Sequence, residues 1–246
     1  MKSITKILLA AVLLTGTGYT YAKPHSIVIK VNTAEIVDRH LSGFNAVNVA
    51  GSFDVYIVQG STESVKVEAP AEVMDHIITE VNGGELKIYN KNDKWNWGNW
   101  WGNHKKIVVY VTAKDLNSIN LSGSGDVFFK DGISANSLKL RVTGSGDMLG
   151  KVNVKTLESS ISGSGDMKLT GQAENSTVRV VGSGDFTARN LLTVSSSVRV
   201  SGSGDAEINA SDKVDAAVNG SGDVRYTGAA RNVSSSKTGS GDITRF

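Results

Sequence analysis

The second half of the chain repeats the tetrapeptide Gly-Ser-Gly-Asp seven times, each time after a run of strand-forming residues. The gaps between the aspartates that end these repeats are 21, 19, 19, 20, 18 and 19 residues. A near-constant period of about twenty residues is the signature of a stacked repeat protein. The aspartates are Asp126, Asp147, Asp166, Asp185, Asp205, Asp223 and Asp242.

Within each repeat, apolar and polar residues alternate, which indicates short strands that bury one face. In the repeat of Asp166, for example, Ile161, Met167 and Leu169 share one parity. Such strands cannot bury their apolar faces alone, but coils stacked in parallel can. The pattern predicts an all-β fold: a single-stranded, right-handed parallel β-helix, or solenoid, with coils of about 19 residues and a less regular N-terminal part. An antiparallel sandwich of hairpins is the alternative, although it would not require the same four residues at every turn.

The tetrapeptide itself suggests a corner between two strands. Its glycines either let the opposite wall approach closely or adopt a positive φ, and a bend is favoured because the apolar alternation resumes beyond it. Serine and aspartate then point outward and form ladders. Neighbouring carboxylates ~5 Å apart in water repel by about 0.8 kcal/mol. We therefore expect each aspartate to accept hydrogen bonds from backbone N–H groups or serine hydroxyls, as a structural turn ladder.

Residues 1–22 have the features of a secretory signal peptide. Lys2 and Lys6 precede a short apolar run, and Thr20-Tyr21-Ala22 is an acceptable cleavage site. Cleavage removes two of the 26 basic residues and none of the 24 acidic ones, which leaves 24 of each. A neutral chain gives no reason to expect nucleic acid or an anionic membrane as partner. We expect an exported protein, in the periplasm, on the outer surface or extracellular, without disulfides because cysteine is absent and without a transmembrane segment after cleavage.

The front half carries the same theme in looser form. Ala50-Gly51-Ser52-Phe53-Asp54-Val55 is interpreted as a degenerate eighth copy of the motif. We expect residues 23–118 to form irregular N-terminal coils, continuous in one domain with the regular solenoid of residues 119–246. Strands are predicted at 55–58, 65–68, 86–89 and 107–111, and a short helical turn at 70–76.

An insertion at residues 91–106 holds all four tryptophans of the chain, interleaved with Asn, Gly and Lys. Flat rings among amide groups suit sugar stacking or a membrane interface. The alternative is a loop that folds back to cover the side wall or an open end of the solenoid. The candidate ligand-binding residues are Trp95, Trp97, Trp100 and Trp101.

Several segments resemble the bacterial family of putative auto-transporter adhesins with a head GIN domain. The resemblance covers roughly residues 41–246 and implies a β-helical extracytoplasmic protein, with adhesion as its role and no catalytic residues to carry over. The segments are Gly43-Phe44-Asn45-Ala46-Val47, Asp54-Val55-Tyr56-Ile57-Val58-Gln59-Gly60, Gly84-Glu85-Leu86-Lys87-Ile88, Val109-Tyr110-Val111-Thr112-Ala113 and the Ser-Gly-Ser-Gly-Asp repeats.

The sequence offers no recognisable catalytic constellation. Its four histidines, His25, His40, His76 and His104, lack metal or triad spacing, and no serine sits in a nucleophile elbow. We therefore predict a non-enzymatic cell-envelope binding protein without cofactor, with a glycan, the cell wall or an envelope protein as ligand. Open solenoid ends are unpaired sheet edges, so a homo-oligomer is possible.

Two other functions remain open. Stacked carboxylates could share Ca²⁺ through oxygen ligands, which would make the chain a Ca²⁺-stabilised structural or matrix protein. A polysaccharide-active β-helix enzyme is the other alternative, because Arg141, Arg179 and Arg199 occupy equivalent repeat positions and form a basic strip beside the acidic ladder. The regularity of that face favours a solvated, ion-paired surface.

Overall fold

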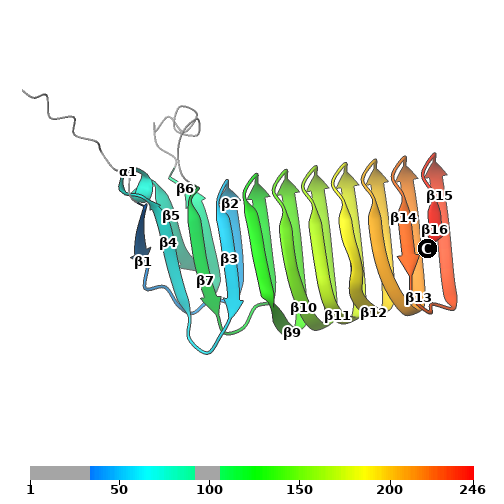
Figure 1. The fold of residues 1–246 in the computed structure, drawn as a ribbon, viewed down its shortest axis with the longest axis horizontal. Helices are drawn as coiled ribbons and strands as arrows, with labels where there is room; N and C mark the ends of the chain where they lie inside the picture. Colours follow the sequence, from blue (N-terminus) through cyan, green and yellow to red (C-terminus); the bar gives the residue numbers. More distant parts are fainter. Residues whose placement is uncertain (1–33, 92–105) are drawn as a thin grey trace, which may run out of the picture. The chain divides into compact units, whose positions relative to one another are not determined.

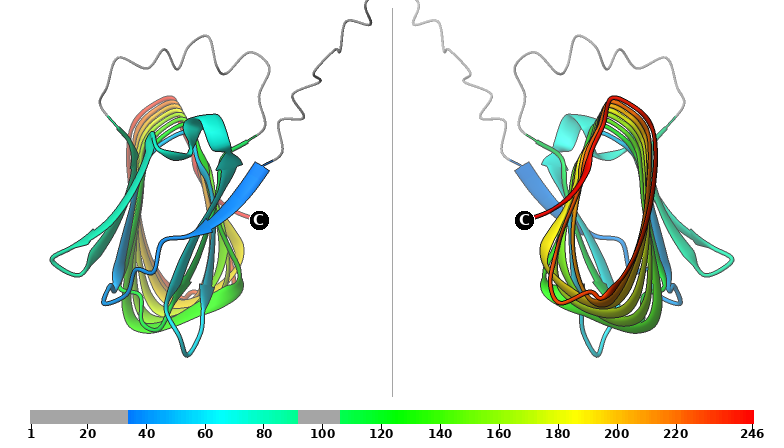
Figure 2. Two further views of the ribbon diagram at one scale, coloured as in Figure 1. Left: turned by 90° about the vertical axis from the view of Figure 1, so that its left-hand side faces the viewer. Right: turned by 90° about the vertical axis from the view of Figure 1, so that its right-hand side faces the viewer.

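The computed structural model describes residues 34–91 and 106–246, and these residues form one continuous hydrogen-bonded sheet (Figure 1). Each long strand runs down one wall, bends, and returns up the opposite wall, so that a single strand makes most of one coil (Figure 2). These strands are β9 (Asp126–Gly144), β10 (Met148–Gly163), β11 (Met167–Gly182), β12 (Phe186–Gly202) and β13 (Ala206–Gly220).

Neighbouring coils pair in parallel and in register, as Met148, Met167 and Phe186 do. The final coil continues this pattern with β14 (Val224–Thr227), β15 (Asn232–Gly239) and β16 (Ile243–Arg245). The predicted all-β solenoid with parallel coils of about 19 residues is therefore confirmed, and the antiparallel sandwich is excluded for the repeats.

The degenerate motif in the front half occupies the place of an eighth repeat. Strands β2 (Ala46–Gly51) and β3 (Asp54–Gln59) form a coil beside β8 (Ser118–Gly123) and the start of β9. Gly51 lies opposite Gly123, and Asp54 lies opposite Asp126. On the other side of this coil lie β6 (Glu85–Asn90) and β7 (Val108–Ala113). The order in the stack, β7-β3-β9, therefore differs from the order in the chain.

Antiparallel strands are added at this end of the stack (Figure 1). β4 (Ser64–Pro70) pairs with β7, β1 (Ala34–Asp38) with β4, and β5 (Ile77–Asn82) with β6. A single turn of helix, α1 (Ala71–Met74), follows Pro70 and buries Val73 and Met74. The predicted strands and helical turn are found where expected, whereas the sequence did not predict the antiparallel pairing. In the part of the chain that the structure describes, no helix is long and apolar enough to cross a membrane.

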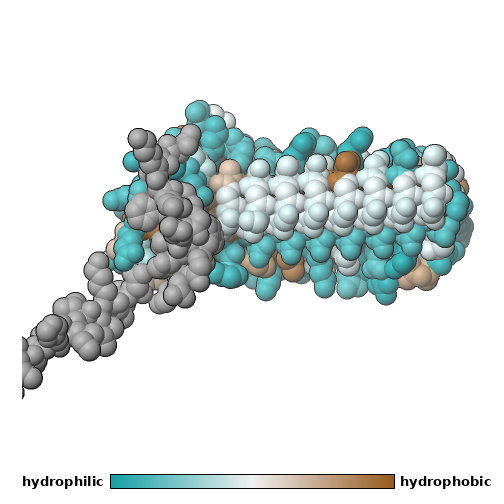
Figure 3. All heavy atoms as spheres, turned by 90° about the horizontal axis from the view of Figure 1, so that it is seen from above, coloured by the Kyte–Doolittle hydropathy of each residue, from teal (hydrophilic) through white to brown (hydrophobic). Residues whose placement is uncertain are grey.

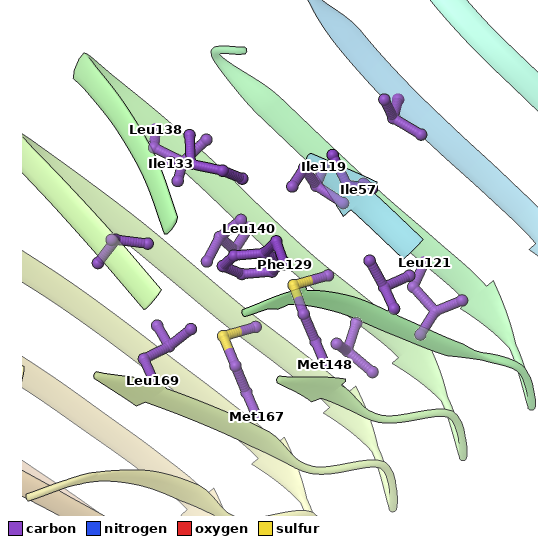
Figure 4. Close-up of a cluster of buried hydrophobic side chains, with 14 of the residues drawn as sticks. Ile57, Ile119, Leu121, Phe129, Ile133, Leu138, Leu140, Met148, Met167 and Leu169 are labelled. Carbon is purple, nitrogen blue, oxygen red and sulfur yellow. The ribbon is translucent and has the colours of Figure 1, made fainter. Parts of the chain in front are cut away.

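The core lies between the two walls and follows from the alternation of apolar residues. In β9, Phe129 projects from one wall and Leu140 from the other, and both are fully buried (Figure 4). A side chain on Gly150, one coil further, would collide with the Phe129 ring, so the glycine makes room for the ring. Burying a side chain of this size stabilises the fold by about 1.5–3 kcal/mol.

Candidate functional site

The two glycines of each motif have different roles at the corner. The first glycine has a positive φ, such as +117° at Gly144 and +128° at Gly163, and turns the chain. The second glycine is buried, and a Cβ there would collide with the carbonyl oxygen of its counterpart in the preceding coil, as Gly165 would with Gly146. The bend favoured by the sequence is thus present at the first glycine, whereas the close approach occurs at both glycines and is to the preceding coil, not to the opposite wall. Figure 3 shows this corner as a pale, even strip along the stack.

The seven motif aspartates form a ladder along this corner. The backbone N–H of each aspartate after Asp126 donates a hydrogen bond to Oδ1 of the aspartate in the preceding coil, from Asp147 onto Asp126 (3.1 Å) to Asp242 onto Asp223 (2.9 Å). The expectation that the carboxylates accept backbone N–H groups is met, although the donors lie one coil away and not in a local turn. The remaining bonds join Asp166 to Asp147, Asp185 to Asp166, Asp205 to Asp185, and Asp223 to Asp205.

Basic side chains offset the negative charge at both ends of the ladder. Lys106 Nζ lies 2.8 Å from Oδ2 of the largely buried Asp54, and Lys237 Nζ lies 2.6 Å from Asp242 Oδ1. The hydrogen bond from Lys106 to Asp54, together with the carboxylate charge, raises the pKa of Lys106. Within the described residues, no group of three or more His, Cys, Asp or Glu side chains could hold a metal ion. Calcium binding along the ladder stays a hypothesis.

The arginines that the sequence placed in one strip do lie in one row. The register runs from Arg141 through Ser160 to Arg179 and Arg199. Arg199 Nη2 donates a hydrogen bond of 2.9 Å to Asp215 Oδ2. This bond is the main reason why the pKa of the Asp215 carboxyl lies below its ordinary value. In this pair the strip is ion-paired on an outer face, as the sequence favoured.

The candidate ligand-binding tryptophans Trp95, Trp97, Trp100 and Trp101 fall in residues 92–105, outside the residues that the structure describes. Their role in ligand binding stays a prediction. The segment that holds them joins the end of β6 to Lys106, just before β7.

The structure reveals a groove that the sequence did not predict. It crosses successive coils, and most of its lining residues lie near the middle of the long strands β9 to β13. There each strand bends at the end of the coil opposite the Gly-Ser-Gly-Asp corner, and this turn is called the lower bend. The volume of the groove is about 950 Å³. The lining residues are Asp115, Ser134, Ala135, Asn136, Asn153, Val154, Lys155, Gln172, Ala173, Glu174, Leu192, Thr193, Val194, Asn209 and Ser211.

Amide and aliphatic side chains share this groove. Asn153 and Gln172 lie opposite each other in register, and Gln172 Nε2 donates a hydrogen bond to Asn153 Oδ1 (2.9 Å). Asn153 Nδ2 and Gln172 Oε1 thus have no protein partner among the described residues. The next residue in the same row is Leu192, which is 60% exposed, and Val194 nearby is 48% exposed. The groove therefore offers hydrogen-bond donors, acceptors and apolar surface to a ligand.

The groove lies where the stack is irregular. Between β9 and β13, the shifts in register occur near Gly150, near Gly171 and around Leu192 and Thr193, all on the wall that leads into the lower bend. Gln59 holds the backbone at one end of the groove, where Ser134 is a lining residue. Its Nε2 donates hydrogen bonds to the Lys114 and Ser134 carbonyls, and its Oε1 accepts one from the Ser134 N–H (2.8 Å). The unequal repeat lengths of 21, 20 and 18 residues were the sequence signal for this irregularity.

An outward-facing aromatic ladder was also missed. The ring centroid of Tyr56 lies 5.8 Å from that of Tyr110 and 4.9 Å from that of Phe128, and both pairs are stacked. Tyr110 donates a hydrogen bond to Glu68, which raises the pKa of its hydroxyl. Tyr56 has a ring on both sides, so this ladder stabilises the outer wall more readily than it offers a platform for a ligand.

The fold and the groove define a parallel β-solenoid with a side-chain-lined lateral groove. A family model described as "Putative auto-transporter adhesin, head GIN domain" matches residues 43–230. The chain therefore belongs to this family, as the resemblance in its sequence implied. No curated protein matches the chain.

A putative adhesin from Bacteroides fragilis is 26% identical with a TM-score of 0.82, over 87% of this chain and 97% of that chain. A putative adhesin from Parabacteroides distasonis is 24% identical with a TM-score of 0.72, over 88% and 98%. A protein of the same species described as a putative lipid binding protein is 24% identical with a TM-score of 0.71, over 88% and 98%. At 24% identity, the last two comparisons show the fold alone.

Proposed function

We propose that this chain is a non-enzymatic, exported binding protein of the cell envelope that holds a linear, uncharged glycan along its lateral groove. Membership of a family named for adhesion supports a binding role. The observation that carries the proposal is the coincidence of the groove with the register shifts of β9–β13. Bulges of this kind are enriched beside functional sites, where they redirect side chains.

The groove suits recognition by side chains. The backbone of β10 pairs with β9 on one side and with β11 on the other, so a peptide strand would find no free sheet edge there. A glycan instead presents hydroxyl groups, which both donate and accept hydrogen bonds. Asn153, Gln172 and Asn209 supply both functions, and the exposed Leu192 can contact the C–H faces of sugar rings.

The charges at the groove favour a neutral ligand. The charged residues among its lining are Asp115, Lys155 and Glu174, of mixed sign. A polyanionic chain would require a cluster of Lys and Arg, which this lining does not contain. The groove also crosses several coils, so an extended polymer matches it better than a compact small molecule does.

The test is retention of glycans by the chain without residues 1–22. Leu192→Arg places a long charged side chain in the groove at an already exposed position, and we expect it to abolish retention of neutral linear glycans on a glycan array. Val181→Arg is the matched control, because Val181 is 42% exposed and lies outside the groove. Equal retention by both variants would contradict a role for the groove. Loss only on Trp100→Ala, with an unchanged melting curve, would assign binding to the tryptophan segment.

A further inference from the structure

We infer that the groove selects linear glycans that carry N-acetyl groups, an inference that rests on the proposed function. An acetamido group combines an N–H donor, a C=O acceptor and a methyl group within a few bonds. The row Asn153, Gln172 and Leu192 presents a donor, an acceptor and an aliphatic side chain on three successive coils.

The polar half of this match follows from the hydrogen bonds of the groove. Because Gln172 Nε2 donates to Asn153 Oδ1 at 2.9 Å, Asn153 Nδ2, a donor, and Gln172 Oε1, an acceptor, keep their full hydrogen-bonding capacity for a ligand. A secondary amide, with one C=O and one N–H group, can use both. The neighbouring Asn209 is already held, since its Nδ2 donates to the Arg189 carbonyl at 3.0 Å.

The apolar half follows from the exposed aliphatic residues. Leu192 interrupts the amide row, and Val194 projects from the same strand two residues further on. Among the described residues that line the groove none is aromatic, so no flat ring is available there for stacking on a whole sugar ring. Small aliphatic surfaces of this kind fit a methyl group. The almost fully buried Ala173 and Val154 line the same stretch and are apolar as well.

The spacing of the coils matches that of the units in a polymer, but the lining of the groove changes from coil to coil. Successive coils lie ~4.8 Å apart, so equivalent positions recur at about the length of one extended sugar unit. A polymer that lies along the groove therefore meets a new set of lining side chains at each coil. Since these sets differ, the amide pair of Asn153 and Gln172 beside Leu192 and Val194 is the place where one acetamido group is selected.

The experiment compares two soluble hexasaccharides with the same linkage, one of N-acetylglucosamine and one of glucose, by calorimetric titration of the chain without residues 1–22. We expect the acetylated hexamer to bind at least about tenfold more tightly, the contribution of one hydrogen bond and one buried methyl group. Leu192→Ser and Asn153→Ala should each reduce this preference about fivefold or more. Val181→Ser and Asn219→Ala, at exposed positions outside the groove, are the matched controls and should leave it unchanged.

The outcomes separate the two proposals. Equal affinity for both hexamers would overturn the selection of N-acetyl groups and leave a glycan-binding groove. Failure of both hexamers and of all other neutral linear glycans to bind would overturn the proposed function and this inference together. A preference that survives both groove substitutions would place the selecting residues elsewhere. Circular dichroism melting curves identify any variant that has lost its fold.

Discussion

Substitution of the second glycine of a motif tests whether close packing between neighbouring coils requires glycine at this position. In Gly165→Ala, the new Cβ would lie closer than 3.0 Å to the carbonyl oxygen of Gly146 in the preceding coil, a separation that real Cβ atoms essentially never show. Gly165 has no positive φ, so its requirement is space and not backbone conformation. The two coils must therefore separate at this corner by roughly 1 Å to regain van der Waals contact.

Three hydrogen bonds join the coils at that point. Ser164 N–H and Gly165 N–H donate to the Gly144 carbonyl at 2.9 and 3.1 Å, and Asp166 N–H donates to Asp147 Oδ1 at 2.9 Å. A separation of about 1 Å would break all three, because hydrogen bonds weaken beyond about 3.2 Å. At about 1 kcal/mol for each bond, we expect a loss of roughly 3 kcal/mol in the free energy of unfolding.

Thermal and urea unfolding, followed by circular dichroism, measure this loss. For a domain of this size, roughly 3 kcal/mol corresponds to a fall in Tm of about 6–12 °C. Ser164→Ala is the matched control, since its side chain is exposed and already has a Cβ, and we expect a change within about 0.5 kcal/mol. If Gly165→Ala were as stable as this control, close packing of the coils would not explain the glycine.

Two further predictions concern carboxylates. Asp166→Asn keeps the oxygen that accepts Asp185 N–H at 2.8 Å and removes repulsion of up to about 0.8 kcal/mol per neighbouring carboxylate, so this variant should be at least as stable as the wild type in urea unfolding. Asp166→Ala removes the acceptor and should lose about 1 kcal/mol of unfolding free energy. An alanine variant more stable than the asparagine variant would contradict the role of the ladder. Arg199 lowers the pKa of Asp215 below 3.8, so this pair stabilises the fold above that pH and the contribution is lost as the pH falls through the lowered pKa. Arg199→Met should therefore raise the pKa of Asp215 in an NMR titration, and an unchanged pKa would contradict the assignment.

The sequence was sufficient to predict the regular part of the fold because its constraints are local and repeated. Each coil carries the same corner, because a Cβ on Gly163 or Gly165 would collide with the backbone of the preceding coil. Alignment on the aspartates therefore gives the register directly, including the match of Asp54 with Asp126, which lie 72 positions apart in the sequence.

The order of the front half could not be predicted in the same way. The coil of β2 and β3 comes first in the sequence but lies in the middle of the stack. The later strands β6 and β7 pair with one side of it, and the still later β8 and β9 pair with the other side. No local pattern records such a choice, since β3 and β7 have the same alternation of buried and exposed residues as any other wall strand. The antiparallel strands β1, β4 and β5 likewise depend on which edge is free once those coils are formed.

The groove escaped prediction for a related reason: it is made from residues that differ between coils. Asn153, Gln172 and Leu192 have no shared identity, and they become neighbours only through the register of β10, β11 and β12. These positions vary from coil to coil, so the repeat pattern of the sequence does not single them out. The repeat lengths are unequal in the sequence, but only the structure shows that the resulting register shifts lie on one wall.

The Gly-Ser-Gly-Asp corner and the lower bend, at opposite ends of each coil, are therefore suited to different functions. At the Gly-Ser-Gly-Asp corner, any side chain on Gly165 would collide with the backbone of the preceding coil, and Asp166 forms a hydrogen bond with the coil on either side of it. This edge can hold the stack together but cannot vary its chemistry. The lower bend tolerates insertions and exposed residues such as Leu192, since its register shifts leave the corner undisturbed. A ligand that distinguishes this chain from another solenoid must consequently be recognised at the lower bend or at the added N-terminal elements.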